Sequence, residues 1–120
     1  MVKHNKDFHL RIHVTPSLSF GPGKAQLLEA VHKTGSISAA ARAMRMSYRR
    51  AWLLLDELNS QFAKPVIRKS KGGKGGGGGA ELTTEGQAVL KLYRAVERKT
   101  AAGLLPALKK LRKLAKVPRR

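Results

Sequence analysis

The run Ser47, Tyr48, Arg49 and Arg50 is where residue type and spacing most clearly suggest chemistry. Positive charge in the first turn of a helix opposes the helix dipole, so a helix that begins here is expected to use these side chains on an anion. Arginine can donate two hydrogen bonds to a guanine edge. The run therefore predicts contact with nucleic acid rather than catalysis.

Other positions extend this basic surface. Ser36 and Ser38 begin an alanine-rich run, where backbone amides can contact phosphate. Arg45 follows that run as a candidate phosphate contact, and the tryptophan one turn after Tyr48 is expected either to pack between helices or to touch DNA. The candidate DNA-binding residues are Ser36, Ser38, Arg45, Ser47, Tyr48, Arg49, Arg50, Trp52, Arg68, Lys71 and Lys74.

The overall charge agrees with a polyanion as the partner. The chain has 120 residues, with 25 Lys and Arg against 7 Asp and Glu, and a formal net charge of +18. Such a balance favours attachment to a polyanion through counterion release, and is unusual for an enzyme of small neutral substrates. Ribosomal, histone-like, RNA-binding and membrane-surface proteins share it, so charge alone leaves these classes open.

Several kinds of chemistry are not expected. The chain has no cysteine, which excludes disulfides, thiolate catalysis and Cys-ligated zinc. His9 and His13 have no third ligand in view, and no catalytic set is visible, so we predict no metal, no cofactor and no enzyme activity. The G-x-G-x-x-G match within residues 72–79 is trivial in a glycine tract. Without a signal peptide or an apolar span of about 20 residues, we expect a cytoplasmic protein that does not enter membranes.

The first elements place a strand before a helix. Residues 8–14 alternate with period 2, which predicts a half-buried strand whose inward residues are Phe8, Leu10, Ile12 and Val14. Residues 15–23 are rich in Pro and Gly and predict a loop. A helix is expected over residues 24–33, with Gly35 at its end.

Residues 36–62 have the pattern of a helix-turn-helix. Residues 36–44 predict a short helix, residues 45–46 a turn, and residues 48–62 a longer helix capped by Ser47. The longer helix has one apolar stripe, formed by Ala51, Leu54, Leu55, Leu58 and Phe62. A plain helical hairpin in a small bundle is the alternative interpretation.

A hairpin and further helices are expected to follow. Residues 64–83 predict two strands around a glycine-rich tip, which is the form of a wing, with a linker as the alternative. A helix then begins at Thr84, which fits a capping box with Gln87, or at Thr83. Its predicted apolar face is Val89, Leu92, Tyr93 and Val96. Gly103 and Pro106 are expected to break it before a last helix over residues 106–116, whose inward residues would be Leu108, Leu111 and Ala115.

The predicted fold class is mainly α with a small β wing (α+β). It is a winged helix-turn-helix with an N-terminal strand and a C-terminal helical extension. We expect residues 1–100 to form the DNA-binding domain, and residues 101–120, with seven bases and no acid, to form a basic helix or tail.

The segment from about residue 8 to residue 100 resembles the DNA-binding domain of ModE-type, molybdate-responsive regulators, which are close to the LysR-type winged helix. The resemblance is carried by Ser36-Ile37-Ser38-Ala39-Ala40-Ala41, by Ser47-Tyr48-Arg49-Arg50-Ala51-Trp52, by the glycine-rich tract that begins at Gly72, and by Leu82-Thr83 with Gly86-Gln87. The combination of the second motif with the wing is the most specific part.

The resemblance implies a sequence-specific regulator that binds double-stranded DNA as a homodimer. Regulators of this family carry molybdate-binding domains after the winged helix, and no room for one remains before Arg120, so we do not expect molybdate sensing. The main alternative is a non-specific architectural protein of the nucleoid type. An RNA-binding winged helix and a membrane-surface or protein-interaction module that uses residues 101–120 remain further alternatives.

Overall fold

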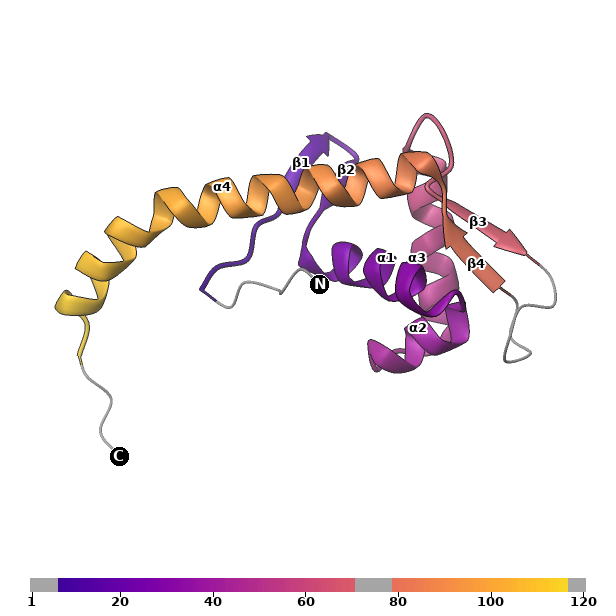
Figure 1. Ribbon diagram of the computed structural model, residues 1–120, viewed down its shortest axis with the longest axis horizontal. Helices are drawn as coiled ribbons and strands as arrows, with labels where there is room; N and C mark the ends of the chain where they lie inside the picture. Colours follow the sequence, from indigo (N-terminus) through magenta and orange to yellow (C-terminus); the bar gives the residue numbers. More distant parts are fainter. Residues whose placement is uncertain (1–6, 71–78, 117–120) are drawn as a thin grey trace.

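The computed structural model describes residues 7–70 and 79–116. A three-helix body lies beside one long helix, with a short hairpin at each side of the body (Figure 1). The elements in chain order are β1 (Ile12–Thr15), β2 (Leu18–Phe20), α1 (Pro22–Thr34), α2 (Ile37–Ala43), α3 (Tyr48–Gln61), β3 (Ile67–Ser70), β4 (Gly79–Leu82) and α4 (Thr84–Leu114). This is an α+β winged helix-turn-helix, as the sequence predicted.

The N-terminal region differs from its prediction. Instead of one strand and a loop, β1 and β2 form an antiparallel hairpin. The hydroxyl of Thr15 accepts a hydrogen bond from the Leu18 amide at 3.1 Å, which closes the turn. The inward pattern is also wrong in part, because Val14 is 51% exposed while Leu18 and Phe20 supply the buried face.

The helix-turn-helix follows local capping signals closely. Gly35 ends α1 in the left-handed conformation, with φ of 70°. A residue with a side chain would be strained in this conformation. Ser36 and Ser47 cap α2 and α3, since each hydroxyl accepts a hydrogen bond from the amide three residues on. Arg45, in the turn, also has a positive φ of 55°. The cap predicted at Ser47 and the helix end predicted at Gly35 are confirmed.

The wing packs closely against the start of α4. Strands β3 and β4 pair antiparallel, with Ile67 opposite Leu82. Thr83 is the cap of α4, and not the capping box from Thr84, because its hydroxyl accepts from the Gly86 amide at 3.0 Å. A Cβ on Gly86 would lie 2.0 Å from the Val66 carbonyl oxygen, so only glycine permits this approach.

The structure also corrects the prediction for the last helices. The predicted break at Gly103 and Pro106 is absent, and α4 continues through both as one helix of 31 residues. Its buried residues in the middle are Tyr93, Arg94 and Glu97, whereas Leu92 is 67% exposed. Of the residues expected to face inward near its end, Leu108 is half-buried, and Leu111 and Ala115 are exposed.

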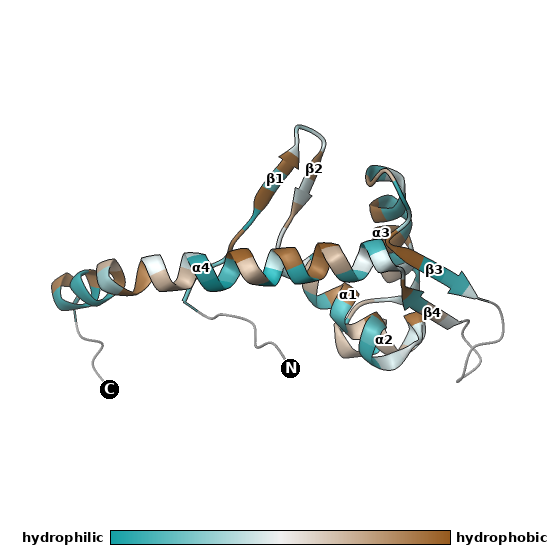
Figure 2. Ribbon diagram, turned by 45° about the horizontal axis from the view of Figure 1, so that its top comes forward, coloured by the Kyte–Doolittle hydropathy of each residue, from teal (hydrophilic) through white to brown (hydrophobic). Residues whose placement is uncertain are grey.

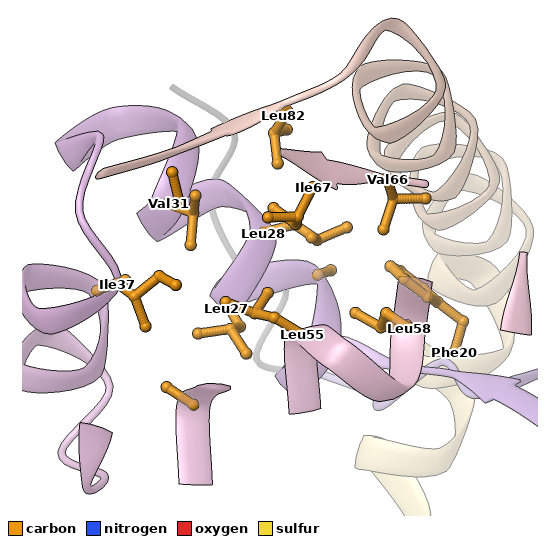
Figure 3. Packing of buried hydrophobic residues seen from close by; sticks show 14 of the residues in the cluster. Phe20, Leu27, Leu28, Val31, Ile37, Leu55, Leu58, Val66, Ile67 and Leu82 are labelled. Carbon is orange, nitrogen blue, oxygen red and sulfur yellow. The ribbon is translucent and has the colours of Figure 1, made fainter. Parts of the chain in front are cut away.

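One core joins the three-helix body, the wing and the first hairpin. Leu27, Leu28 and Val31 of α1 are completely buried, as are Leu55 and Leu58 of α3. These side chains meet residues of the wing and the hairpin in one cluster (Figure 3), to which the non-helical elements contribute Leu18, Phe20, Val66, Ile67, Ala80 and Leu82. This core holds the buried face of α3 within the three-helix body and leaves the opposite face of α3 in solvent.

Candidate nucleic-acid interface

The first turn of α3 presents an exposed basic surface. Tyr48, Arg49 and Arg50 are all exposed, and no acidic residue lies in this turn. The Ser47 hydroxyl accepts from the Arg50 amide at 3.0 Å, so one free amide of the turn is satisfied without a neutralising charge. The positive end of the helix dipole and two guanidinium groups therefore act together here, as an anion-binding surface requires.

Charge changes sign along α3. The buried positions Ala51, Leu55 and Leu58 set one face of the helix against the core, and the opposite face begins with Arg49. Its later turns carry Asp56 and Glu57, both exposed. Because carboxylates repel phosphate, this gradient favours approach of a polyanion to the N-terminal end of α3 rather than to its whole length.

The tryptophan of α3 contacts the wing. Lys69 of β3 places its Nζ 4.0 Å from the centroid of the Trp52 ring. The same ammonium group lies 3.4 Å from Oδ1 of Asp56. Lys69 was absent from the sequence prediction, although alternation in β3 puts it on the same side as the buried Ile67, and that signal could have predicted a packed lysine.

Two predicted phosphate contacts have different environments. Ser36 is 7% exposed, its hydroxyl caps α2, and its amide donates to Thr34 Oγ1 at 3.3 Å. The amide predicted to bind phosphate is therefore already used within the protein. Ser38 is half-buried at the second position of α2, where helix geometry leaves the amide without an intrahelical acceptor.

The remaining candidates lie in the turn and the wing. Arg45 is exposed between α2 and α3. Arg68 of β3 is exposed and forms an ion pair with Glu81, the residue opposite it on β4, at 2.8 Å. Lys71 and Lys74 lie outside the described residues. The structure thus brings Arg45 and the first turn of α3 onto one structural unit, the helix-turn-helix, with Arg68 on the wing beside it (Figure 1).

A helix-turn-helix followed by a two-stranded wing and a long helix defines the class of regulatory winged-helix proteins. The sequence model of bacterial regulatory helix-turn-helix proteins of the lysR family matches residues 23–87, which run from the second residue of α1 through α2, α3 and the wing to the first turn of α4. The chain belongs to this family.

Known proteins similar to the chain support the resemblance to ModE-type regulators that the sequence indicated. The transcriptional regulator ModE of Haemophilus influenzae is 36% identical over 94 residues, which are 78% of the chain and 36% of that protein. The molybdenum-pterin-binding protein MopB of Rhodobacter capsulatus is 44% identical over 77 residues, 64% of the chain and 28% of that protein. The DNA-binding transcriptional dual regulator ModE of Escherichia coli is 36% identical over 84 residues, 70% of the chain and 32% of that protein. The chain spans about a third of the length of these relatives.

Among the residues that the structure describes, none of the helices combines the length and the apolar character needed to cross a bilayer. The second half of α4 carries several lysine and arginine residues, which agrees with the lack of an apolar span in this helix.

Proposed function

We propose that this chain binds specific sequences in double-stranded DNA and regulates transcription through that binding. The observation that carries the proposal is the first turn of α3, where Tyr48, Arg49 and Arg50 project from a capped helix end. In a helix-turn-helix this turn enters the major groove and reaches the base edges. Arg49 lies opposite the buried face of α3, so it is assigned the bidentate contact with a base.

The backbone of the DNA would be contacted from both sides of α3. Arg45 in the turn and the free amide of Ser38 are assigned to phosphate on one side. Arg68 of the wing is assigned to the other, where its pair with Glu81 is exposed enough to exchange for a phosphate. From their place in the sequence, Lys71 and Lys74 are proposed to add contacts at the wing tip.

The regulator is proposed to act as a homodimer, since one recognition helix reads too few base pairs for a unique site. The proposed contact surface is an apolar groove between the first hairpin and α4; Figure 2 shows the hydropathy of these two elements. Val14, Leu92 and Val96 are exposed within it, at 51%, 67% and 40%. The groove is lined by Ile12, Val14, Phe20, Phe62, Val89, Leu92, Tyr93 and Val96.

Replacing Arg49 with alanine tests the assignment of the recognition helix. The variant is expected to lose about 1–3 kcal/mol of discrimination between a preferred duplex and its scrambled form, because the bidentate contact is lost. The measurement is the ratio of Kd values for the two duplexes at one fixed salt concentration. Lys91→Ala, on the exposed side of α4, removes the same charge and should keep the parent ratio. An unchanged ratio in Arg49→Ala would remove this residue from base recognition.

DNA binding as proposed here does not involve molybdate. A non-specific architectural protein is the competing function, and it would give a ratio of Kd values near one for the parent chain as well as for both variants. The parent ratio therefore separates the two functions before any variant is compared.

A further inference from the structure

One stripe of α3 contacts the wing. Trp52, Asp56 and Asn59 are spaced by four and three residues, so they lie along one side of the helix. Each of them contacts the segment that contains β3. The stripe thus connects the recognition helix to the first strand of the wing.

Asn59 fastens the base of that strand. Its Oδ1 accepts hydrogen bonds from the amides of Val66 and Ile67, both at 2.9 Å. Its Nδ2 donates to the Ile67 carbonyl at 3.0 Å. These three bonds fix where β3 begins, but they act close to the core and leave the outer half of the strand to other contacts.

Lys69 supplies the outer attachment. Its ammonium group lies over the face of Trp52 and beside Asp56, two residues further along β3 than the bonds of Asn59. The Lys69 side chain is 27% exposed, against 67% for its neighbour Arg68. A two-stranded sheet is only marginally stable alone, so its orientation depends on such contacts. Strand β4 is anchored separately, by the Ala80 amide on the Gly35 carbonyl at 3.1 Å.

We propose that Trp52, Asp56 and Lys69 form a clamp that sets the wing relative to the recognition helix, and that Trp52 acts through this contact rather than by reading a base. The proposal rests on the proposed function, because it assumes that α3 and the wing bind one DNA duplex together. Trp52 and Lys69 are then positioning residues. In the clamp Lys69 covers one face of the indole, and this contact is kept while the DNA is bound.

The contact itself can be tested in the free protein. Trp52 is the single tryptophan of the chain, so its fluorescence reports on this site alone. Lys69→Met removes the ammonium group but retains most of the aliphatic length of the side chain. It should raise the acrylamide quenching of Trp52 above that of the parent. Lys64→Met, an exposed lysine before the strand, is the matched control and should leave quenching unchanged. Equal quenching in the parent and Lys69→Met would overturn the clamp, whether or not the chain binds DNA.

The positioning role is tested by a double-mutant cycle on a preferred DNA duplex. Lys69→Met and Trp52→Leu should each weaken binding roughly two- to sixfold, the range expected from a partly exposed cation–π contact. The double variant should be no weaker than either single variant, because both remove one interaction. Losses that multiply would overturn the proposal, since they would show that Lys69 and Trp52 contact the DNA independently. Lys69→Arg keeps charge and stacking and should restore binding.

Fluorescence of the parent during DNA titration gives a further criterion. Trp52 is 37% exposed, but if Lys69 stays on its ring and no base stacks against it, its emission should change little at saturation. Strong quenching that follows the binding curve would overturn the proposal, because it would place the ring against the bases. If the parent fails to bind duplex DNA at all, the proposed function fails, and the quenching result for the free protein still decides whether the contact exists.

Discussion

Tyr93 shows how one side chain of α4 joins the first hairpin to the core. Its hydroxyl donates to the Leu10 carbonyl at 2.6 Å, and its ring meets Phe20 edge to face at 5.1 Å. Burial and, to a lesser degree, the negative charge of Glu97 raise the pKa of Tyr93 to about 12, and the positive charge of Arg94 partly opposes them. The neutral phenol is therefore the form that the folded protein favours.

This raised pKa predicts a loss of stability at high pH. The folded protein holds the phenolic proton more tightly than the unfolded chain, in which the pKa is about 10. The contribution of Tyr93 is therefore complete below pH 10 and declines as the pH rises toward 12. Urea unfolding at pH 8, 10 and 11 measures this decline against Tyr93→Phe. The variant should lose about 1 kcal/mol at pH 8 and show a smaller decline above pH 10. Parallel declines in the two proteins would contradict the account.

The burial of Arg94 could not be predicted from the periodicity of the sequence. It is 3% exposed and lies 2.8 Å from Glu97 and 3.4 Å from Glu29 of α1. The apolar face predicted for this helix assumed that charged residues face solvent. Here two carboxylates from different helices compensate one buried guanidinium, and sequence spacing alone does not show which helices meet.

At the scale of elements, the local signals were the reliable ones. The cap at Ser47 and the end of α1 at Gly35 depend on bonds within four residues, so the sequence predicts them correctly. The β1–β2 hairpin and the continuity of α4 depend on other factors. Pro106 removes one backbone donor, but the Ala102 carbonyl that loses its partner is on an exposed residue where water can replace the bond. The helix therefore continues where the sequence predicted a break.

The candidate site was predictable to the same degree. The first turn of α3 is recognised from residue types and a capping serine, whereas Lys69 and the buried state of Ser36 follow from how β3 and β4 pack against the body. Such contacts join residues distant in sequence. Lys71 and Lys74 lie outside the described residues and remain predictions from the sequence.

Two glycines of α4 should respond in opposite ways to alanine. In Gly86→Ala the new Cβ meets the Val66 carbonyl, so the start of α4 must shift away from the wing, at a cost of roughly 1–3 kcal/mol or more. In Gly103→Ala nothing lies within 4 Å, so the variant should gain about 0.5–1 kcal/mol from helix propensity. Thermal unfolding of both variants gives the comparison. Equal changes of the same sign would show that Gly86 does not carry the packing described.

For the whole molecule, the apolar groove and the basic surface imply different partners. The groove between β1, β2 and α4 is proposed to bind a second copy of the chain. The basic surface at the first turn of α3, in a chain of net charge +18, is proposed to bind DNA. A principal axis of 54 Å against 25 Å for the shortest reflects the length of α4, which carries the groove residues at one end and lysines at the other. Assembly and DNA binding are thus assigned to separate surfaces.

Replacing Leu92 with glutamate tests the assembly. Leu92 is 67% exposed, so the variant should fold normally, yet a carboxylate in an apolar contact should shift the chain from dimer to monomer. Sedimentation at micromolar concentration measures this. Leu114→Glu, at a position 85% exposed near the end of α4, is the matched control and should sediment like the parent. A parent chain that is strictly monomeric would contradict the proposed dimer.

Selection of bound duplexes from a random pool tests the central claim most directly. If the first turn of α3 reads base edges in a homodimer, successive rounds should enrich an inverted repeat whose half-sites are about one helical turn apart. The enriched duplex should bind at least about a thousandfold more tightly than its scrambled form at physiological salt. A pool that stays random, with equal binding to every duplex, would contradict sequence-specific recognition and leave only attachment through charge.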